Sequence, residues 1–193
     1  STTQIAALES TDMAVLNTAQ VFVFNSSQLG AIETGDIGSL STNAVRAFHT
    51  DSISGLSTSQ IAQLNSYQVS ALTSSQTAQF NTAQALALET RDISALTTAA
   101  LRTLTTTATA ALSTDQIQAL TTTQTAALTT NQAQVLTAAQ IAALQSTDLA
   151  NLNSAQVAVF DSAQIAAIET ADISALTTTA FKALAVDSVV GLS

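Results

Sequence analysis

The side chains that could carry out chemistry are few along this chain of 193 residues. There is no Cys, so the chain has no thiolate nucleophile and no Cys-based metal site. His49 is the only histidine. A catalytic histidine needs a nucleophile or an acid beside it, whereas His49 stands at a position that is polar in most repeats of the chain. We therefore expect it to cap a helix.

The carboxylates and glycines form no recognisable site either. Asp51, Asp115 and Asp187 lack the dense Asp/Gly spacing of a calcium loop. Gly35 and Gly38 do not make a phosphate-binding motif. We expect no catalytic residue, no cofactor and no metal, and a protein that is not an enzyme.

One charged pattern recurs three times, each time with two acids followed by a base. It comprises Glu33 and Asp36 before Arg46, Glu89 and Asp92 before Arg102, and Glu169 and Asp172 before Lys182. We interpret it as a structural ion pair between successive helices, or as charges placed to suit the helix dipole. The alternative is a contact with another molecule during assembly. A carboxylate pair for hydrolysis is disfavoured, because no single copy is special.

Composition excludes two classes of partner. The net charge is −9 and only four residues are Lys or Arg. A nucleic-acid-binding protein needs clustered basic residues to displace counterions, and attraction to an anionic membrane surface needs them too. No apolar run approaches the roughly 20 residues of a transmembrane helix. We therefore expect neither nucleic acid nor membrane insertion.

The chain is built from an eight-residue repeat that never slips. Every residue whose number is a multiple of eight, from Leu8 to Leu192, is Leu, Phe or Ile, which defines 24 octads. The consensus is polar–Thr–x–Gln–Ile–x–Ala–Leu, as at residues 113–120. An internal repeat of this kind is the signature of a stacked array.

A chain with an eight-residue repeat cannot form one continuous helix or one continuous strand. In a continuous helix, eight residues advance about 80° beyond two turns, so the Leu stripe would wind around the axis. In a continuous strand, positions five and eight would point to opposite faces. The backbone must therefore restart in every octad.

The residues at the start of each octad indicate that a new helix begins there with an N-terminal cap. Residues 57–60 and 121–124 are capping boxes, in which a Ser or Thr and a Gln three residues later bond each other's amides. The Leu before the cap and the Ile at position five form a hydrophobic staple, as in Leu56 with Ile61. We predict a helix of six or seven residues in each octad. Such helices are too short to persist alone and must stack.

The predicted fold is thus an all-α solenoid of 24 short capped helices, one per octad. A β-solenoid is the alternative, since Thr, Val and Ile favour strands, but Ala, Gln and Leu favour helices. Longer repeats lie above the octad: residues 8–56 recur at 144–192, and a module recurs at 24–48, 80–104 and 160–184. Its 24-residue unit suggests three helices per turn, with two or four still open. We expect a single uninterrupted array over residues 1–193.

Residues 128–144, LTTNQAQVLTAAQIAAL, resemble the Ala/Thr/Gln octapeptide arrays of large bacterial surface or secreted proteins. The resemblance covers the whole chain. It implies a repeat architecture and an extracellular or cell-surface location. It implies no catalytic residue.

Some large apolar side chains break the polar pattern. They are Phe22, Tyr67, Leu86 and Val190, with Val189 beside the last of these. Each either fills a gap between helices or is an exposed apolar contact at an assembly interface.

These observations favour a structural role. Solenoid ends normally need polar capping repeats, yet the first octad is as regular as an internal one, and the last, residues 185–192, is not polar. We expect self-association by stacking of solenoid ends into an extracellular filament, fibre or adhesin stalk, with a cell-surface or matrix partner as a further option. The alternatives are an α-solenoid that binds protein or glycan, and a Thr array that binds ice or another ordered surface.

Overall fold

The computed structural model describes residues 1–185. Within that range the chain forms twenty α-helices and three 3₁₀ helices, each three to six residues long, and no strand. The all-α prediction is confirmed and the β-solenoid alternative is wrong. Most of the helices are shorter than the predicted six or seven residues, although some, such as α5 (Thr42–Ala47), have six. The backbone is already extended at position eight and stays so at position one, as at Leu56 (ψ 127°) and Ser57 (ψ 161°).

The predicted caps form. The Ser57 hydroxyl accepts from the Gln60 amide while the Gln60 side chain accepts from the Ser57 amide, and residues 121–124 do the same. His49 is the N-cap of a 3₁₀ helix, and its ring nitrogen accepts from the Asp51 amide. A helix of five residues leaves most of its amides without an internal partner, so each cap satisfies donors that the helix cannot.

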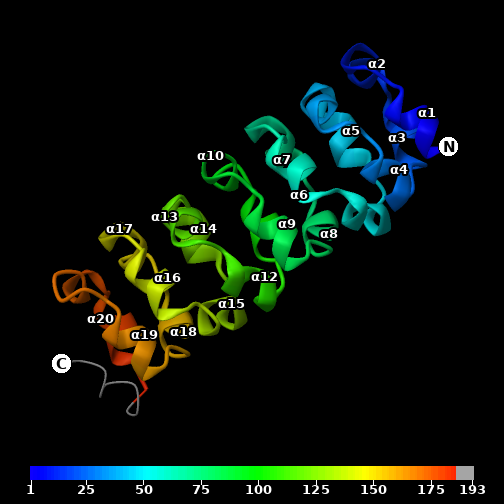
Figure 1. Ribbon diagram of the computed structural model, residues 1–193. Helices are drawn as coiled ribbons and strands as arrows, with labels where there is room; N and C mark the ends of the chain where they lie inside the picture. Colours follow the sequence, from blue (N-terminus) through cyan, green and yellow to red (C-terminus); the bar gives the residue numbers. More distant parts are fainter. Residues whose placement is uncertain (186–193) are drawn as a thin grey trace.

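The helices stack in three columns, because each helix packs against the helix three octads away (Figure 1). One turn of the solenoid is therefore three octads, or 24 residues, as the module length suggested. The first column contains α1 (Thr2–Ala6), α4 (Ser26–Gly30), η2 (Thr50–Gly55), α8 (Ser74–Thr77), α11 (Thr98–Leu101), α14 (Thr122–Ala127), α17 (Ser146–Leu149) and η3 (Ile173–Ala175). The second contains α2 (Ser10–Val15), η1 (Thr34–Ser39), α6 (Thr58–Ala62), α9 (Thr82–Leu86), α12 (Thr106–Ala111), α15 (Thr130–Gln134), α18 (Ser154–Val157) and α20 (Thr178–Lys182). The third contains α3 (Thr18–Phe22), α5 (Thr42–Ala47), α7 (Ser66–Ala71), α10 (Thr90–Ile93), α13 (Thr114–Gln118), α16 (Ala138–Ala142) and α19 (Ser162–Ala166).

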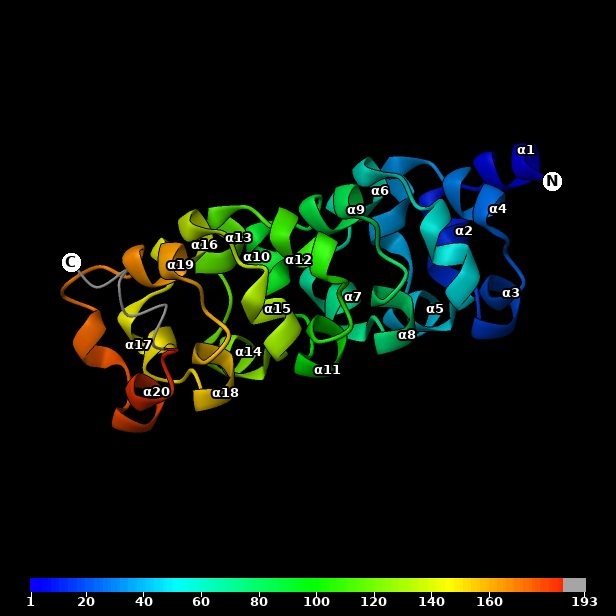
Figure 2. The same ribbon diagram turned by 90° about the horizontal axis from the view of Figure 1, so that it is seen from below.

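The described residues form an elongated stack that follows the order of the sequence. Figures 1 and 2 show α1 at one end and α20 at the other, with successive turns side by side between them. We call the place where one octad ends and the next begins a corner.

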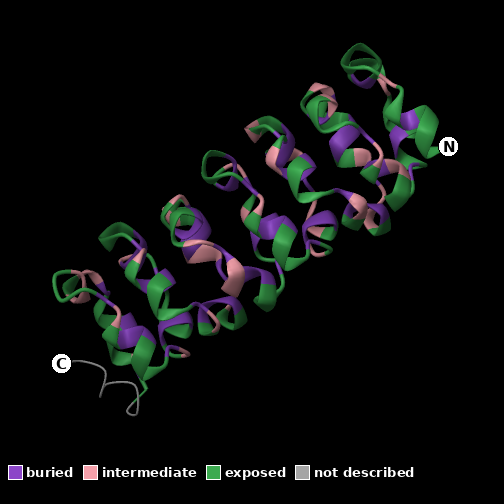
Figure 3. Ribbon diagram, viewed as in Figure 1, coloured by how far each residue is buried: buried purple, intermediate pink, exposed green. Residues whose placement is uncertain are grey.

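The core runs along the axis of this stack. Positions five and eight point inward and form one continuous buried cluster, seen as the purple segments in Figure 3. Three buried threonines, Thr77, Thr109 and Thr125, occupy position five, and the hydroxyl of each donates to the carbonyl four residues earlier. Because the core is shared between turns, the apolar side chains of each helix are covered by side chains of neighbouring turns.

Two turns approach each other closely at α4 and η2. A Cβ added to Gly55 would lie 2.1 Å from the Ser26 carbonyl oxygen, and one added to Gly30 would lie 2.9 Å from the Gly55 carbonyl oxygen. Position seven of one octad therefore faces the octad three before it. It must be small where the backbones are this close.

We expect Gly55→Ala to lower the free energy of unfolding by about 1–3 kcal/mol, the usual cost of overpacking. Its Cβ would meet main-chain atoms of Ser26, which cannot move aside as a flexible side chain would. Urea denaturation followed by circular dichroism measures the change. The matched control is Gly35→Ala, where the added Cβ meets nothing within 4 Å. Equal stability of the two variants would contradict the close approach.

Candidate interaction surfaces along the array

A ladder of buried glutamines at position four joins each turn to the previous one. Gln124 shows the geometry. Its Oε1 accepts from the Thr121 amide at 2.8 Å, and its Nε2 donates to the carbonyls of Ile93 at 3.0 Å and Leu96 at 2.8 Å. The side chain therefore bridges the start of one helix and the end of another helix a turn below.

Ten glutamines repeat this bridge, each donating to carbonyls 28 and 31 residues earlier. They are Gln60, Gln68, Gln76, Gln84, Gln116, Gln124, Gln132, Gln140, Gln156 and Gln164. All are almost completely buried. The capping box was visible in the sequence, but the reach of Nε2 to the turn below was not, because it depends on three octads making a turn.

Besides single replacements at Asp12 and Asp148, the ladder is interrupted in three blocks of one full turn each. Position four is not Gln in the three successive octads of residues 33–56, 89–112 and 169–192, the last block extending beyond the described residues. We call these the glutamine-free turns. They contain all four basic residues of the sequence, and η1, η2 and η3 all lie in them. The acid-and-base pattern therefore occurs in the turns that lack the glutamine ladder.

The ion pairs predicted for this pattern do not form among residues 1–185. Arg46, Arg102 and Lys182 make no salt bridge there, and the arginine that pairs with acids is Arg91, with Glu89 at 2.9 Å and Asp92 at 3.2 Å. The bases lie one column away from their acids and point outward. Their role as assembly contacts stays a prediction.

The aspartates of the pattern instead bond to the turn below. Asp36, Asp92 and Asp172 each accept from a serine hydroxyl 26 residues earlier, on Ser10, Ser66 and Ser146 respectively. A carboxylate cannot donate to the carbonyls that Gln reaches. The aspartate thus replaces two or three glutamine bonds with one bond from a serine.

Asp148 also replaces a glutamine, but its surroundings differ. It is buried in α17, where its carboxylate accepts from the Gln145 amide at 3.3 Å and lies near the Thr125 side chain. Burial raises the pKa of Asp148, and the polar partners Gln145 and Thr125 oppose the shift. Its ionised form therefore costs the folded state some stability.

Three of the five candidate apolar contacts are exposed. Phe22 is 53%, Tyr67 79% and Leu86 49% exposed, so they do not fill gaps between helices. The Phe22 and His49 rings form a T-shaped pair, with ring centroids 5.3 Å apart. Val189 and Val190 lie outside the described residues. Whether the three exposed side chains contact another molecule stays a prediction.

Sequence reasoning missed three other exposed side chains, Val15, Val23 and Phe181. Val15 and Val23 stand at position seven, which is usually small, and that departure was the available signal. Both belong to the first turn of the solenoid and are 78% and 72% exposed. In later turns the same residue type at the same position, Val135 or Val159, is partly buried, because position seven faces the preceding turn.

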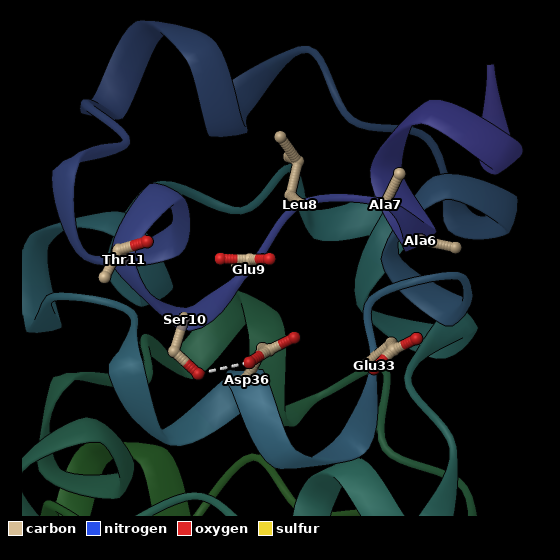
Figure 4. A pocket seen from close by; sticks show the side chains of 8 residues that line it. All are labelled: Ala6, Ala7, Leu8, Glu9, Ser10, Thr11, Glu33 and Asp36. Carbon is tan, nitrogen blue, oxygen red and sulfur yellow. Dashed lines mark hydrogen bonds between the residues drawn. The ribbon is translucent and has the colours of Figure 1, made fainter.

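A surface cavity lies between the first turn and the first glutamine-free turn (Figure 4). It is lined by Leu8, Glu9, Ser10, Glu33 and Asp36, with Ala6, Ala7 and Thr11. Although three carboxylates are near it, residues 1–185 contain no group of three or more His, Cys, Asp or Glu able to hold a metal ion. No helix in the described part of the chain is long and apolar enough to cross a bilayer.

Stacked short helices, a shared core and a repeating cross-turn bond define an α-helical repeat solenoid. The ALTTAQ repeat family matches residues 5–32, 29–66, 85–122 and 141–178. The matches cover more than half of the chain, which therefore belongs to this family. No curated protein matches the chain.

We expect Gln124→Glu to make stability depend on pH. Burial and the carbonyls of Ile93 and Leu96 favour the protonated acid and raise its pKa in the folded state. The folded state then binds more protons than the unfolded state, so stability is complete at low pH and is lost as pH rises through the folded pKa. At pH 7 the loss should be about 1–3 kcal/mol, the cost of an unsatisfied buried group.

Urea unfolding at pH 4 and pH 7 measures this loss. The matched control is Gln118→Glu, at an exposed position of the preceding helix. A difference between pH 4 and pH 7 no larger in Gln124→Glu than in the control would show that the ladder does not bear on stability.

Asp148→Asn should increase the free energy of unfolding at pH 7. The native carboxyl has a raised pKa, so its contribution is complete below the unfolded pKa and falls as pH rises through the folded pKa. Asn keeps the acceptor oxygen and removes the buried charge. Thermal unfolding between pH 3 and pH 7 measures the effect, with the exposed Asp115→Asn as the control for net charge. A stabilisation no greater than that of the control would refute this account.

Proposed function

We propose that this chain is a structural protein, a segment or subunit of a bacterial extracellular filament, fibre or adhesin stalk. It acts as an extended scaffold and not as an enzyme. The proposal is supported by the uniform octads and the continuous core, and by the resemblance to octapeptide arrays of bacterial surface proteins. The filament grows when the end of one solenoid stacks on the end of another.

The single observation that carries the proposal is that the first four octads have the parts with which interior octads bond to the turn below them. Gln4, Gln20 and Gln28 form capping boxes with Oε1, but within residues 1–185 their Nε2 groups have no partner. In interior turns the corresponding Nε2 groups donate to two carbonyls. Val15 and Val23 extend the same surface with exposed apolar area.

A second copy is the occupant that fits this surface. Another turn of the same octad would supply the carbonyls of positions five and eight to the glutamines. It would also cover Val15 and Val23 to the extent that Val135 and Val159 are covered. The contact is heterologous, so it does not close on itself and produces an open filament.

The double variant Val15→Asp, Val23→Asp should shorten or abolish the filaments, because two buried carboxylates would oppose the contact. Negative-stain electron microscopy and sedimentation velocity over a range of concentrations measure assembly. The double variant Thr114→Asp, Ala139→Asp, which introduces the same charge at exposed positions on the flank, is the control and should assemble like the wild type. Monodisperse monomers of the wild type at high concentration would overturn the proposal, as would equal assembly of both variants.

A further inference from the structure

Two surface cavities lie where the ladder lacks a glutamine. One, of about 470 Å³, is lined by Leu8 and Glu33 among others, below Asp36. The second, of about 380 Å³, is lined by Leu72 and Thr97 among others, at the corner where Ala100 replaces Gln. In both, the lining includes position eight of one octad and position one of the octad 25 residues further on. These are the residues whose main chains a ladder glutamine would bridge.

The main-chain groups at these two corners are unpaired within residues 1–185. The Thr97 amide and the Leu72 carbonyl have no hydrogen-bond partner there, and neither have the Glu33 amide and the Leu8 carbonyl. At a filled corner the equivalent groups, the Thr121 amide and the Leu96 carbonyl, both bond to Gln124. Each cavity therefore presents one donor and one acceptor in the arrangement that a glutamine side chain satisfies elsewhere in the chain.

The donor and the acceptor at each corner fit a carboxamide. It must accept from an amide N–H and donate to a carbonyl, and a primary amide does both with adjacent atoms. An ammonium group has no acceptor for the Thr97 amide, and a carboxylate has no donor for the Leu72 carbonyl. The ten filled corners of this chain are the template for the fit.

The chain itself carries suitable carboxamides on its outer surface. Gln63, Gln79, Gln118 and Gln134 are exposed, and their side chains bond to nothing within the described residues. They stand at positions six and seven, close to the corners. A neighbouring copy lying alongside can present them to the cavities.

We propose that the open corners at Leu72–Thr97 and Leu8–Glu33 are lateral docking sites, each accepting a glutamine side chain from a second copy. The inference rests on the proposed structural function and adds to it the contact that binds filaments side by side. End stacking and corner docking use different residues. Each can therefore fail without the other.

Filling the corners from within the chain tests the proposal. Ala100→Gln and Asp36→Gln, singly and together, should occupy the cavities and raise the concentration needed for lateral association at least about tenfold, equivalent to about 1.4 kcal/mol. Ala83→Gln adds a glutamine at an exposed position beside a filled corner, and it should associate like the wild type. Sedimentation velocity in the Val15→Asp, Val23→Asp background removes end stacking from the measurement.

Hydrogen exchange of the wild type supplies a readout that needs no filled corner. Protection of the Thr97 and Glu33 amides should rise with protein concentration, and it should be independent of concentration in the filled variants. The proposal is overturned if these amides exchange at a constant rate while the protein associates. It is also overturned if filling both corners leaves association unchanged in a protein that remains folded.

Discussion

The glutamine carboxamide that joins two turns is the interaction on which this solenoid depends. A helix of five residues cannot satisfy its own terminal amides and carbonyls, and a solenoid of such helices has a helix end at every corner. One side chain solves both problems. Gln124 accepts from the amide that begins its own helix and donates to the carbonyls that end α10, one turn below. The same atoms that cap the helices therefore set the register between turns.

Where the ladder is interrupted, the packing changes in ways that follow from the missing side chain. Small residues at position four allow backbones to approach, and at α4 and η2 the approach leaves no room for a Cβ on Gly55. The three 3₁₀ helices of the described chain all occur in these turns. Surface cavities open at two of their corners. The octad repeat thus builds two kinds of contact between turns, one bridged by glutamine and one with closer backbones.

The charged pattern takes its meaning from the arithmetic of the turn. Glu33 and Glu89 are 56 residues apart, which is seven octads. Since three octads make a turn, the second copy is displaced by one column, and Arg46 and Arg102 belong to different columns. The bases therefore form no continuous stripe along one side. Successive copies of the charged pattern, although regularly spaced in the sequence, therefore lie on different sides of the solenoid.

The sequence alone determined the repeating unit, the capped helix in each octad and the inward direction of positions five and eight. These depend on residues within eight positions of each other, such as Ser57 with Gln60, and local hydrogen bonds and side-chain periodicity decide them. Only the tertiary structure decided what lies across a turn. Three of these features join residues 25 or more positions apart: the bonds from Gln124 to carbonyls of the turn below, the bond from a serine to Asp92 and the close approach of Gly55 to Ser26. The exposure of Val15 depends on whether a neighbouring turn covers it. Such contacts follow from how many octads make a turn, which the 24-residue module suggested but did not fix, and from how closely each turn approaches the next, which no sequence pattern carries.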